Sequence, residues 1–314
     1  MRFLFVDRIL ELVEGQFIRG LKHVTSDDAF LYVTATGLAY FPPALIGETL
    51  GQLAAWNVML TQDFQHRPVA GIAQEAISLR PVHAGETLLL ESFIDHLDTS
   101  VVTYHSVASV GDEPVFILNG ALGPLLPMRD FIDESLVRLQ FQQIFRPGAW
   151  PPANDKPTPL LTDLPKRPMP WLYFDRILDH EPHKKITAEK KITFSAPYFP
   201  DHFPKKPVLP LTVLLECILN LATHLVAPQK KTVGFSTPSI DFADKPRDEG
   251  FRPNCQQRPV RLTKIKMKAF IQPGDVIRTT LAVRSQSAHD ITLQSITELD
   301  GKRICVAELS YPKE

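Results

Sequence analysis

The stretch FLFVDRILELVEGQFIRGLKHVT at residues 3–25 returns in changed form as WLYFDRILDHEPHKKITAEKKIT at residues 171–193. The two stretches align without a gap, and the same register leads on to a glutamate in each copy, Glu48 and Glu216. A register held over this length indicates an internal duplication. A chain of 314 residues is also long enough to bury two separate cores. We therefore predict two copies of one fold.

The two copies differ in length after this region. RPVHAGETLLLES resembles KAFIQPGDVIRTT, but the pairing of Gly85 with Gly274 no longer fits the first register, because the second copy is longer. The second copy therefore carries an extra segment of about 21 residues, which we place at about 236–259. The expected organisation is a first domain at 1–127, a proline-rich linker at 128–169 and a second domain at 170–314.

Each copy is predicted to fold as one helix surrounded by antiparallel strands, an α+β arrangement. Leucines and alanines recur at three- and four-residue spacing over 43–61 and 211–226, which predicts two helices that are apolar on most faces. Segments such as TLLLESFIDHL and VIRTTLAVRS alternate in polarity and end in turn residues, which is typical of antiparallel strands. The linker begins with a further candidate helix at 133–145, and its later prolines favour an extended spacer.

Several motifs of both copies resemble one known family. FVDRILEL, HVTSDDAF and above all HFPKKPVLP followed by LLECILN are similar to the hot-dog-fold beta-hydroxyacyl-acyl-carrier-protein dehydratases. The helix acid is Glu rather than Asp, as in the FabZ type. The resemblance covers both halves and leaves out the linker and the insertion. It implies a double hot-dog, in which two antiparallel sheets each wrap round a central helix and form a pseudo-dimer within one chain.

In this family each active site takes a histidine from one subunit and an acid from the other. The register places His202 and Glu216 at these two positions in the second copy. The first copy keeps Glu48 at the acid position but has Thr34 in place of the histidine, and threonine is not a base near neutral pH. The resemblance therefore implies that only one of the two sites has its base.

The family also uses a backbone N–H at the amino end of the central helix to polarise the thioester carbonyl. That position is Leu211 in the second copy and Pro43 in the first, and proline has no N–H. We predict one working site made of His202, the Leu211 amide and Glu48, with Gln52 as a supporting partner of Glu48. The silent site would consist of Thr34, Pro43 and Glu216.

Two of these assignments have alternatives. Glu48 could be a relic that a neighbouring hydroxyl or a water satisfies, although a carboxylate in a buried helix face is costly without a purpose. Gln52 could make only ordinary helix-cap or interhelical hydrogen bonds. The resemblance is also imperfect, because Asp201 and Leu211 stand where the family has glycine.

The chemistry implied by the resemblance is the dehydration of a 3-hydroxyacyl thioester to a trans-2-enoyl thioester in fatty-acid or polyketide-like synthesis. This reaction needs a base for the C2 proton and an acid for the C3 hydroxyl, for which His202 and Glu48 are the candidates. No cofactor or metal is implied. An acyl-thioester hydrolase or an enoyl hydratase on the same fold is one alternative. A non-catalytic scaffold that binds an acyl carrier is another.

The expected partner is acyl carrier protein with a phosphopantetheine-linked acyl chain. Residues 1–157 hold 10 Lys and Arg against 18 Asp and Glu, whereas the remainder holds 24 against 17. The basic second half could dock an acidic carrier, or the two halves could simply attract each other. Arginine-rich and aromatic interleaving is missing, so no nucleic-acid partner is expected. The candidate docking residues, against the alternative of a merely solvated basic face, are Lys205, Lys206, Arg176, Lys230 and Lys231.

We expect a cytoplasmic protein without a membrane span. In MRFLFVDRIL, Asp7 and Arg8 follow a very short apolar run, unlike a secretory signal, and no apolar run reaches the roughly 18 residues that span a bilayer. The three cysteines lack metal-ligand spacing, which favours a reduced compartment. Single-domain members of the family commonly assemble, so a homo-oligomer of pseudo-dimers is a possible assembly of this chain.

Overall fold

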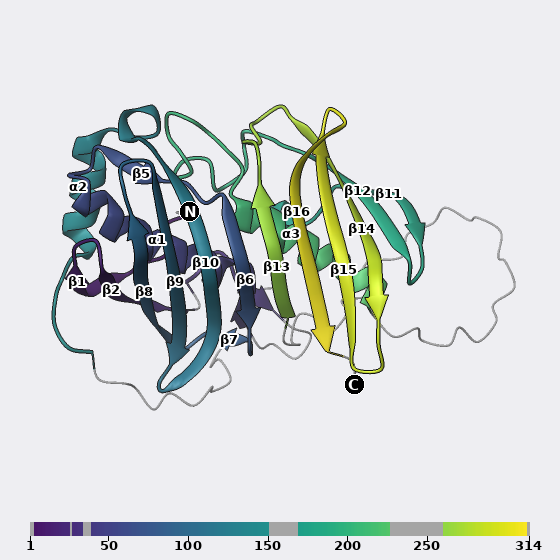
Figure 1. Cartoon of the computed structure of the whole chain (residues 1–314), viewed down its shortest axis with the longest axis horizontal. Coiled ribbons are helices and arrows are strands. Elements are labelled where there is room, and N and C mark those ends of the chain that lie inside the picture. Colours follow the sequence, from purple (N-terminus) through teal and green to yellow (C-terminus); the bar gives the residue numbers. More distant parts are fainter. Residues whose placement is uncertain (1–2, 26, 34–38, 151–168, 227–259, 313–314) are drawn as a thin grey trace, which may run out of the picture.

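In the computed structural model, residues 3–25, 27–33, 39–150, 169–226 and 260–312 are described (Figure 1). One antiparallel sheet of 13 strands runs through both halves, in the order β1-β2-β8-β9-β10-β6-β13-β16-β15-β14-β12-β11, with β5 paired to β10 beside this path. The first half supplies β1 (Arg8–Val13), β2 (Phe17–His23), β5 (His66–Pro68), β6 (Ile72–Ser78), β8 (Thr87–Leu97), β9 (Val101–Val110) and β10 (Glu113–Pro127). The second half supplies β11 (Arg176–Glu181), β12 (Lys185–Lys191), β13 (Val260–Met267), β14 (Val276–Gln286), β15 (Asp290–Leu299) and β16 (Lys302–Pro312).

The sequence predicted two sheets, and the structure joins them edge to edge. Strand β6 of the first half pairs with β13 of the second in an antiparallel ladder from Val260 opposite Ser78 to Lys266 opposite Ile72. Each of these strands would otherwise present a row of unpaired N–H and C=O groups, which pairing removes. A separate small sheet contains β3 (Tyr32–Val33), β4 (Ala39–Phe41) and β7 (Val82–His83).

The two central helices lie behind this sheet and contact each other at the seam (Figure 1). The helices α1 (Pro43–Thr61) and α3 (Leu211–Val226) confirm the predicted ranges. Proline is well suited to the first position of α1, because the N–H that it lacks would have no partner within the helix. Leu50 and Leu53 of α1 are fully buried, as are Leu214 and Ile218 of α3, so both helices form the core of their half.

The region after β10 contributes structure of its own to the first half. It contains the short 3-10 helix η1 (Met128–Asp130) and the helix α2 (Glu134–Ile144), which confirms the candidate helix. Phe141 of α2 packs against Trp56 and Phe64, with ring centres 6.0 and 5.6 Å apart. Another short 3-10 helix, η2 (Pro170–Leu172), precedes β11. The proline-rich spacer beyond residue 150 and the insertion at 236–259 lie outside the described residues, and the domain bounds stay a prediction.

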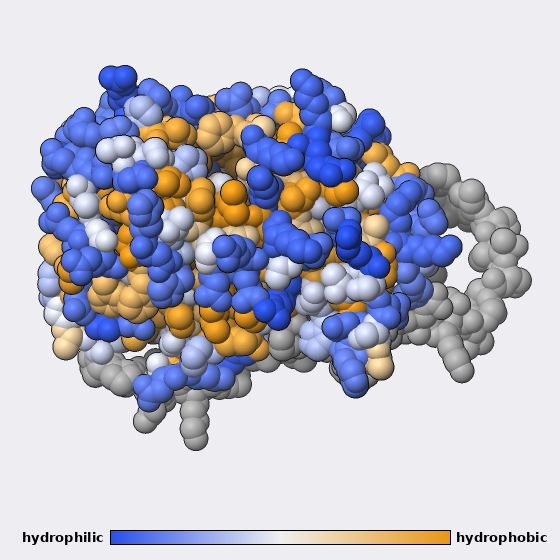
Figure 2. All heavy atoms as spheres, in the orientation of Figure 1, coloured by the Kyte–Doolittle hydropathy of each residue, from blue (hydrophilic) through white to orange (hydrophobic). Residues whose placement is uncertain are grey.

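The outer face of the sheet carries apolar side chains among polar ones (Figure 2). The exposed large apolar residues include Leu79, Phe93 and Val276, which are 37–41% accessible. Within the described ranges, no helix combines the length and the hydropathy that a membrane crossing requires.

Candidate active site

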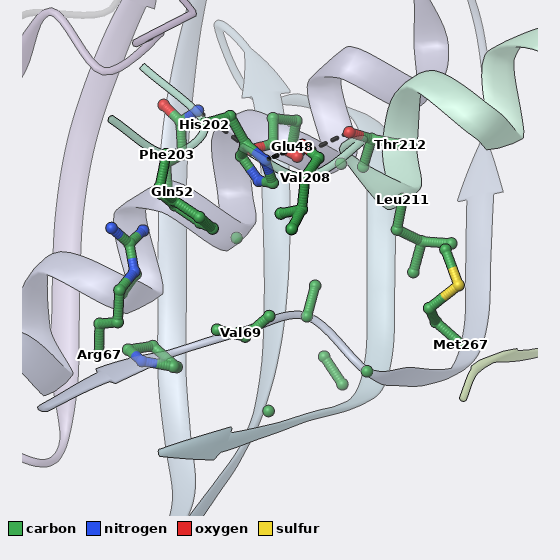
Figure 3. A pocket seen from close by; sticks show the side chains of 18 of the residues that line it. Glu48, Gln52, Arg67, Val69, His202, Phe203, Val208, Leu211, Thr212 and Met267 are labelled. Atoms are coloured by element: carbon green, nitrogen blue, oxygen red, sulfur yellow. Dashed lines mark hydrogen bonds between the residues drawn. The ribbon is translucent and has the colours of Figure 1, made fainter. Parts of the chain in front are cut away.

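A cavity of about 530 Å³ opens where α1 meets the start of α3 (Figure 3). Its lining comes from both halves of the chain, including Glu48 of the first and His202 of the second. Most of the other lining side chains are apolar, and Tyr104, Phe116 and Leu262 are among them. The cavity can therefore hold an apolar chain next to a small number of polar groups.

His202 lies in the loop before α3 with its ring fixed on one side. Its Nδ1 is 3.0 Å from the carbonyl oxygen of Val208. A carbonyl oxygen can only accept a hydrogen bond, so Nδ1 carries the proton and Nε2 is left as an acceptor. Burial lowers the pKa of His202 below its ordinary 6.5, while the charge of Glu48 acts in the opposite direction. The imidazole is therefore neutral at pH 7 and able to take a proton.

Glu48 projects from α1 into the same cavity and is held by both halves. Thr212, the second residue of α3, donates its hydroxyl to Glu48 Oε2 at 2.6 Å. Gln52, one turn further along α1, donates its amide to Glu48 Oε1 at 3.1 Å. In Figure 3 Glu48 lies beside the His202 ring, and both side chains line the cavity. The structure thus brings His202 of one copy together with the acid of the other.

Gln52 also connects this carboxyl to the beginning of the chain. Its Oε1 accepts the N–H of Phe5 at 2.9 Å, and its Nε2 donates to the carbonyl of Phe3 at 3.1 Å. Asp201 accepts the N–H of Phe3 at 2.7 Å. The first residues described in the structure therefore tie the loop that carries His202 to the helix that carries Glu48.

Leu211 is the first residue of α3 and lines the cavity. The first four N–H groups of a helix have no acceptor within the helix. The Leu211 amide is one of these, and it lies at the positive end of the helix dipole. Pro43, at the matching position of α1, offers no such donor.

The second glutamate has a different environment. Glu216 is fully buried and is not among the residues that line the cavity. Its Oε2 accepts the N–H of Ala44 at 3.1 Å, and its Oε1 accepts the hydroxyl of Tyr32 at 3.1 Å. Asn220 in turn donates to the Tyr32 hydroxyl oxygen at 2.7 Å. Burial raises the pKa of Glu216 to about 7. Thr34, predicted for this site, lies outside the described residues.

Two cavity residues were missed by the sequence analysis. Thr212 shows no signal beyond being a hydroxyl residue at a helix start, and its partner Glu48 is 164 positions away. Arg67 of β5 lines the cavity, and its guanidinium carbon lies 3.7 Å from the centre of the Phe203 ring. Arg67 gave no signal in the sequence, because the residues between α1 and β5 around it are mostly polar.

The candidate docking residues do not form one cluster. Lys205 pairs with Asp133, and the Lys206 ammonium lies 4.7 Å from the centre of the Phe270 ring, close to the cavity lining. Arg176 lies instead on β11, the last strand of the sheet, where it pairs with a glutamate of β12 at 2.7 Å. Lys230 and Lys231 lie outside the described residues.

Comparisons with known proteins identify the class to which this fold and site belong. The model of the FabA-like domain matches residues 164–308. The 3-hydroxyacyl-[acyl-carrier-protein] dehydratase FabZ of Burkholderia thailandensis is 31% identical over 151 residues, which are 48% of this chain and 82% of that protein. FabZ of Burkholderia mallei is also 31% identical, over 48% of this chain and 85% of its own length. The chain belongs to the FabZ dehydratase family.

A comparison of structures covers the whole chain. A crystal structure of a putative oleoyl thioesterase from Lactobacillus plantarum superposes with a TM-score of 0.52 at 11% sequence identity. The match includes 96% of this chain and 99% of that one. At this identity the likeness concerns the fold alone, and it confirms the expected double hot-dog.

The buried Glu216 predicts a specific pH dependence of stability. Its pKa in the folded chain is about 7, against 4.5 for a free side chain, so the folded state binds the proton more tightly. The free energy of unfolding that this tighter proton binding adds is present in full below pH 4.5 and is lost as the pH rises through 7. At about 1.4 kcal/mol for each pH unit, this loss amounts to roughly 3 kcal/mol. Glu216→Gln should therefore lose less stability than the wild type between pH 5 and pH 8 in urea unfolding.

The matched control for this experiment is Glu298→Gln, because Glu298 is exposed at the end of β15. It should keep the wild-type pH dependence. If Glu216→Gln and the wild type lose equal stability over this pH range, Glu216 is not the titrating group.

Proposed function

We propose that the protein dehydrates 3-hydroxyacyl thioesters on acyl carrier protein to trans-2-enoyl thioesters, as part of fatty-acid or polyketide-like synthesis. The observation that carries the proposal is that His202 and Glu48, from different copies of the repeat, line one cavity. Membership of the FabZ family supports it. One chain would then contain one composite active site and one silent one.

In the proposed reaction His202 is the base. Its Nε2 takes the proton from C2, which the thioester carbonyl acidifies, and Nδ1–H keeps its hydrogen bond to Val208 throughout. The electrons of the broken C–H bond first move toward the thioester oxygen. The Leu211 amide at the start of α3 would stabilise this negative charge, and such a donor is typically worth about 3 kcal/mol in the transition state.

Glu48 is the proposed acid. As the C2=C3 double bond forms, the C3–O bond breaks and Glu48 gives its proton to the departing hydroxyl, which leaves as water. The proton taken up by His202 then returns to the carboxylate or to solvent, so the enzyme ends as it began. The hydroxyl of Thr212 and the amide of Gln52 would hold the carboxyl in place while its charge changes.

The proposed partner is acyl carrier protein, and the proposed location is the cytoplasm. Lys205 and Lys206 are the best candidates to meet the carrier, because they immediately follow the loop residues that line the cavity. Arg176 is a weaker candidate, since it lies on β11, the last strand of the sheet, and not beside the residues that line the cavity.

Variants of the three acidic and basic residues test the composite site. His202→Ala and Glu48→Gln should each lower the rate of dehydration by about 100-fold or more, the usual effect of losing a general base or acid. Glu216→Gln should keep most of the activity. The reaction is followed by the ultraviolet absorbance of the conjugated enoyl thioester. An active Glu48→Gln enzyme together with an inactive Glu216→Gln enzyme would overturn the assignment.

The same assay distinguishes the related activities. Release of a free thiol without enoyl absorbance would identify a thioester hydrolase. Binding of the acyl carrier without any turnover would identify a scaffold.

The lowered pKa of His202 predicts how the rate of dehydration changes at acidic pH. A base must be unprotonated to act, and burial lowers the pKa of His202 below 6.5. The value of kcat/KM for dehydration should therefore stay high down to about pH 6.5 and fall only at lower pH. A loss of activity that is already half complete above pH 7 would contradict a neutral, buried imidazole.

A further inference from the structure

Arg67 is a charged residue in the cavity wall that the proposed reaction does not use. It lies on β5 of the first half, beside the rings of Phe203 and Phe131, whose centres are 3.7 and 5.7 Å from its guanidinium carbon. Its Nε is buried and has no hydrogen-bond partner. Within the described parts of the chain, the guanidinium forms neither a hydrogen bond nor an ion pair.

Arg67 as a whole is partly buried, but its Nε is closed to solvent, and a buried donor of a cation is costly without an acceptor. Burial lowers the pKa of Arg67 to about 9, so the side chain is still charged at neutral pH. Glu48 is the acid that acts on it through space, but its hydrogen bonds come from Gln52 and Thr212 and not from Arg67. Because the Arg67 Nε has no partner within the described chain, it is available to a ligand in the cavity.

The guanidinium is close to the reacting groups. Phe203 stacks on His202 with ring centres 4.1 Å apart, and the Arg67 guanidinium carbon lies 3.7 Å from the centre of the same Phe203 ring. The guanidinium and the imidazole therefore contact one shared aromatic ring. Figure 3 shows Arg67 on one side of the His202 and Glu48 pair and Met267 on the other. The imidazole and the guanidinium carbon can therefore be no further apart than the sum of these two distances, which places a ligand group on Arg67 within several bonds of the carbons that react at His202.

We propose that Arg67 binds an oxyanion carried by the thioester substrate, and that this oxyanion is a carboxylate on the acyl chain. The inference rests on the proposed function and adds the substrate class. A planar guanidinium pairs with a carboxylate or a phosphate through two parallel hydrogen bonds, so both groups have the required chemistry. The phosphate of the carrier arm is about 15 Å from the sulfur when the arm is extended, at the usual reach per bond. That length exceeds the separation that a single shared ring allows between Arg67 and His202, which favours the carboxylate.

The experiment measures binding rather than turnover, so that it does not depend on dehydration. The probes are non-hydrolysable thioethers of N-acetylcysteamine with equal acyl lengths, one ending in a carboxylate and one in its methyl ester. A second pair compares pantetheine with 4′-phosphopantetheine thioethers. Binding to the wild type and to Arg67→Met, which keeps much of the side-chain volume, is measured by calorimetry. Arg303→Met, at an exposed position of β16, is the control.

The wild type and Arg303→Met should bind the carboxylate probe at least about tenfold more tightly than the methyl ester, which is the effect of one charge-assisted pair. Arg67→Met should lose this preference and keep its affinity for the ester. A preference for the phosphate probe that disappears in Arg67→Met would support oxyanion binding and identify the carrier arm as its source. If the wild type prefers neither anionic probe, the proposal is overturned, whether or not the variant folds.

The proposed function and this inference can fail separately. Absence of enoyl product from every thioester, together with a carboxylate preference in binding, would reject the dehydratase and keep the Arg67 site. Dehydration of alkyl-chain substrates without any preference for an anion would keep the dehydratase and reject the Arg67 site.

Discussion

Each central helix places a glutamate against the amino end of the other, and the rest of the site depends on this reciprocal contact. Glu48 of α1 is held at the start of α3 by the Thr212 hydroxyl, whereas Glu216 of α3 is held at the start of α1 by the Ala44 backbone N–H. Thr212 and Ala44 occupy the same position of the repeat. Each carboxyl oxygen accepts a hydrogen bond at a helix start, from the Thr212 hydroxyl in one half and from a backbone N–H without an acceptor inside the helix in the other.

Thr212 has a hydroxyl and Ala44 does not, and this difference decides whether the helix start beside each glutamate is open to a ligand. Thr212 holds Glu48 through a side chain, which keeps the carboxyl in the cavity and leaves the Leu211 amide for a ligand. Ala44 has no polar side chain, so Glu216 bonds to the backbone itself, and the Tyr32 hydroxyl satisfies its other oxygen. In one half the helix start can receive a ligand, and in the other it has become a buried structural contact.

The sequence predicted the parts of this arrangement that are carried by periodicity and register. The spacing of apolar residues gave the ranges of α1 and α3, and the register of the repeat paired Glu48 with Glu216. The joining of the two sheets through β6 and β13 could not be predicted, because the polarity pattern of an edge strand does not say which strand it will pair with. For the same reason the contacts of Thr212 and Arg67 were missed, since they depend on which residues the seam brings together.

The central claim is that the base and the acid of one site belong to the same polypeptide. The most direct measurement mixes native His202→Ala protein with native Glu48→Gln protein and compares the rate of dehydration with that of each protein alone. Because both residues lie within one chain, the mixture should show only the sum of the two residual activities. Recovery of activity on mixing would mean that different chains supply the histidine and the glutamate, and it would contradict the intrachain site.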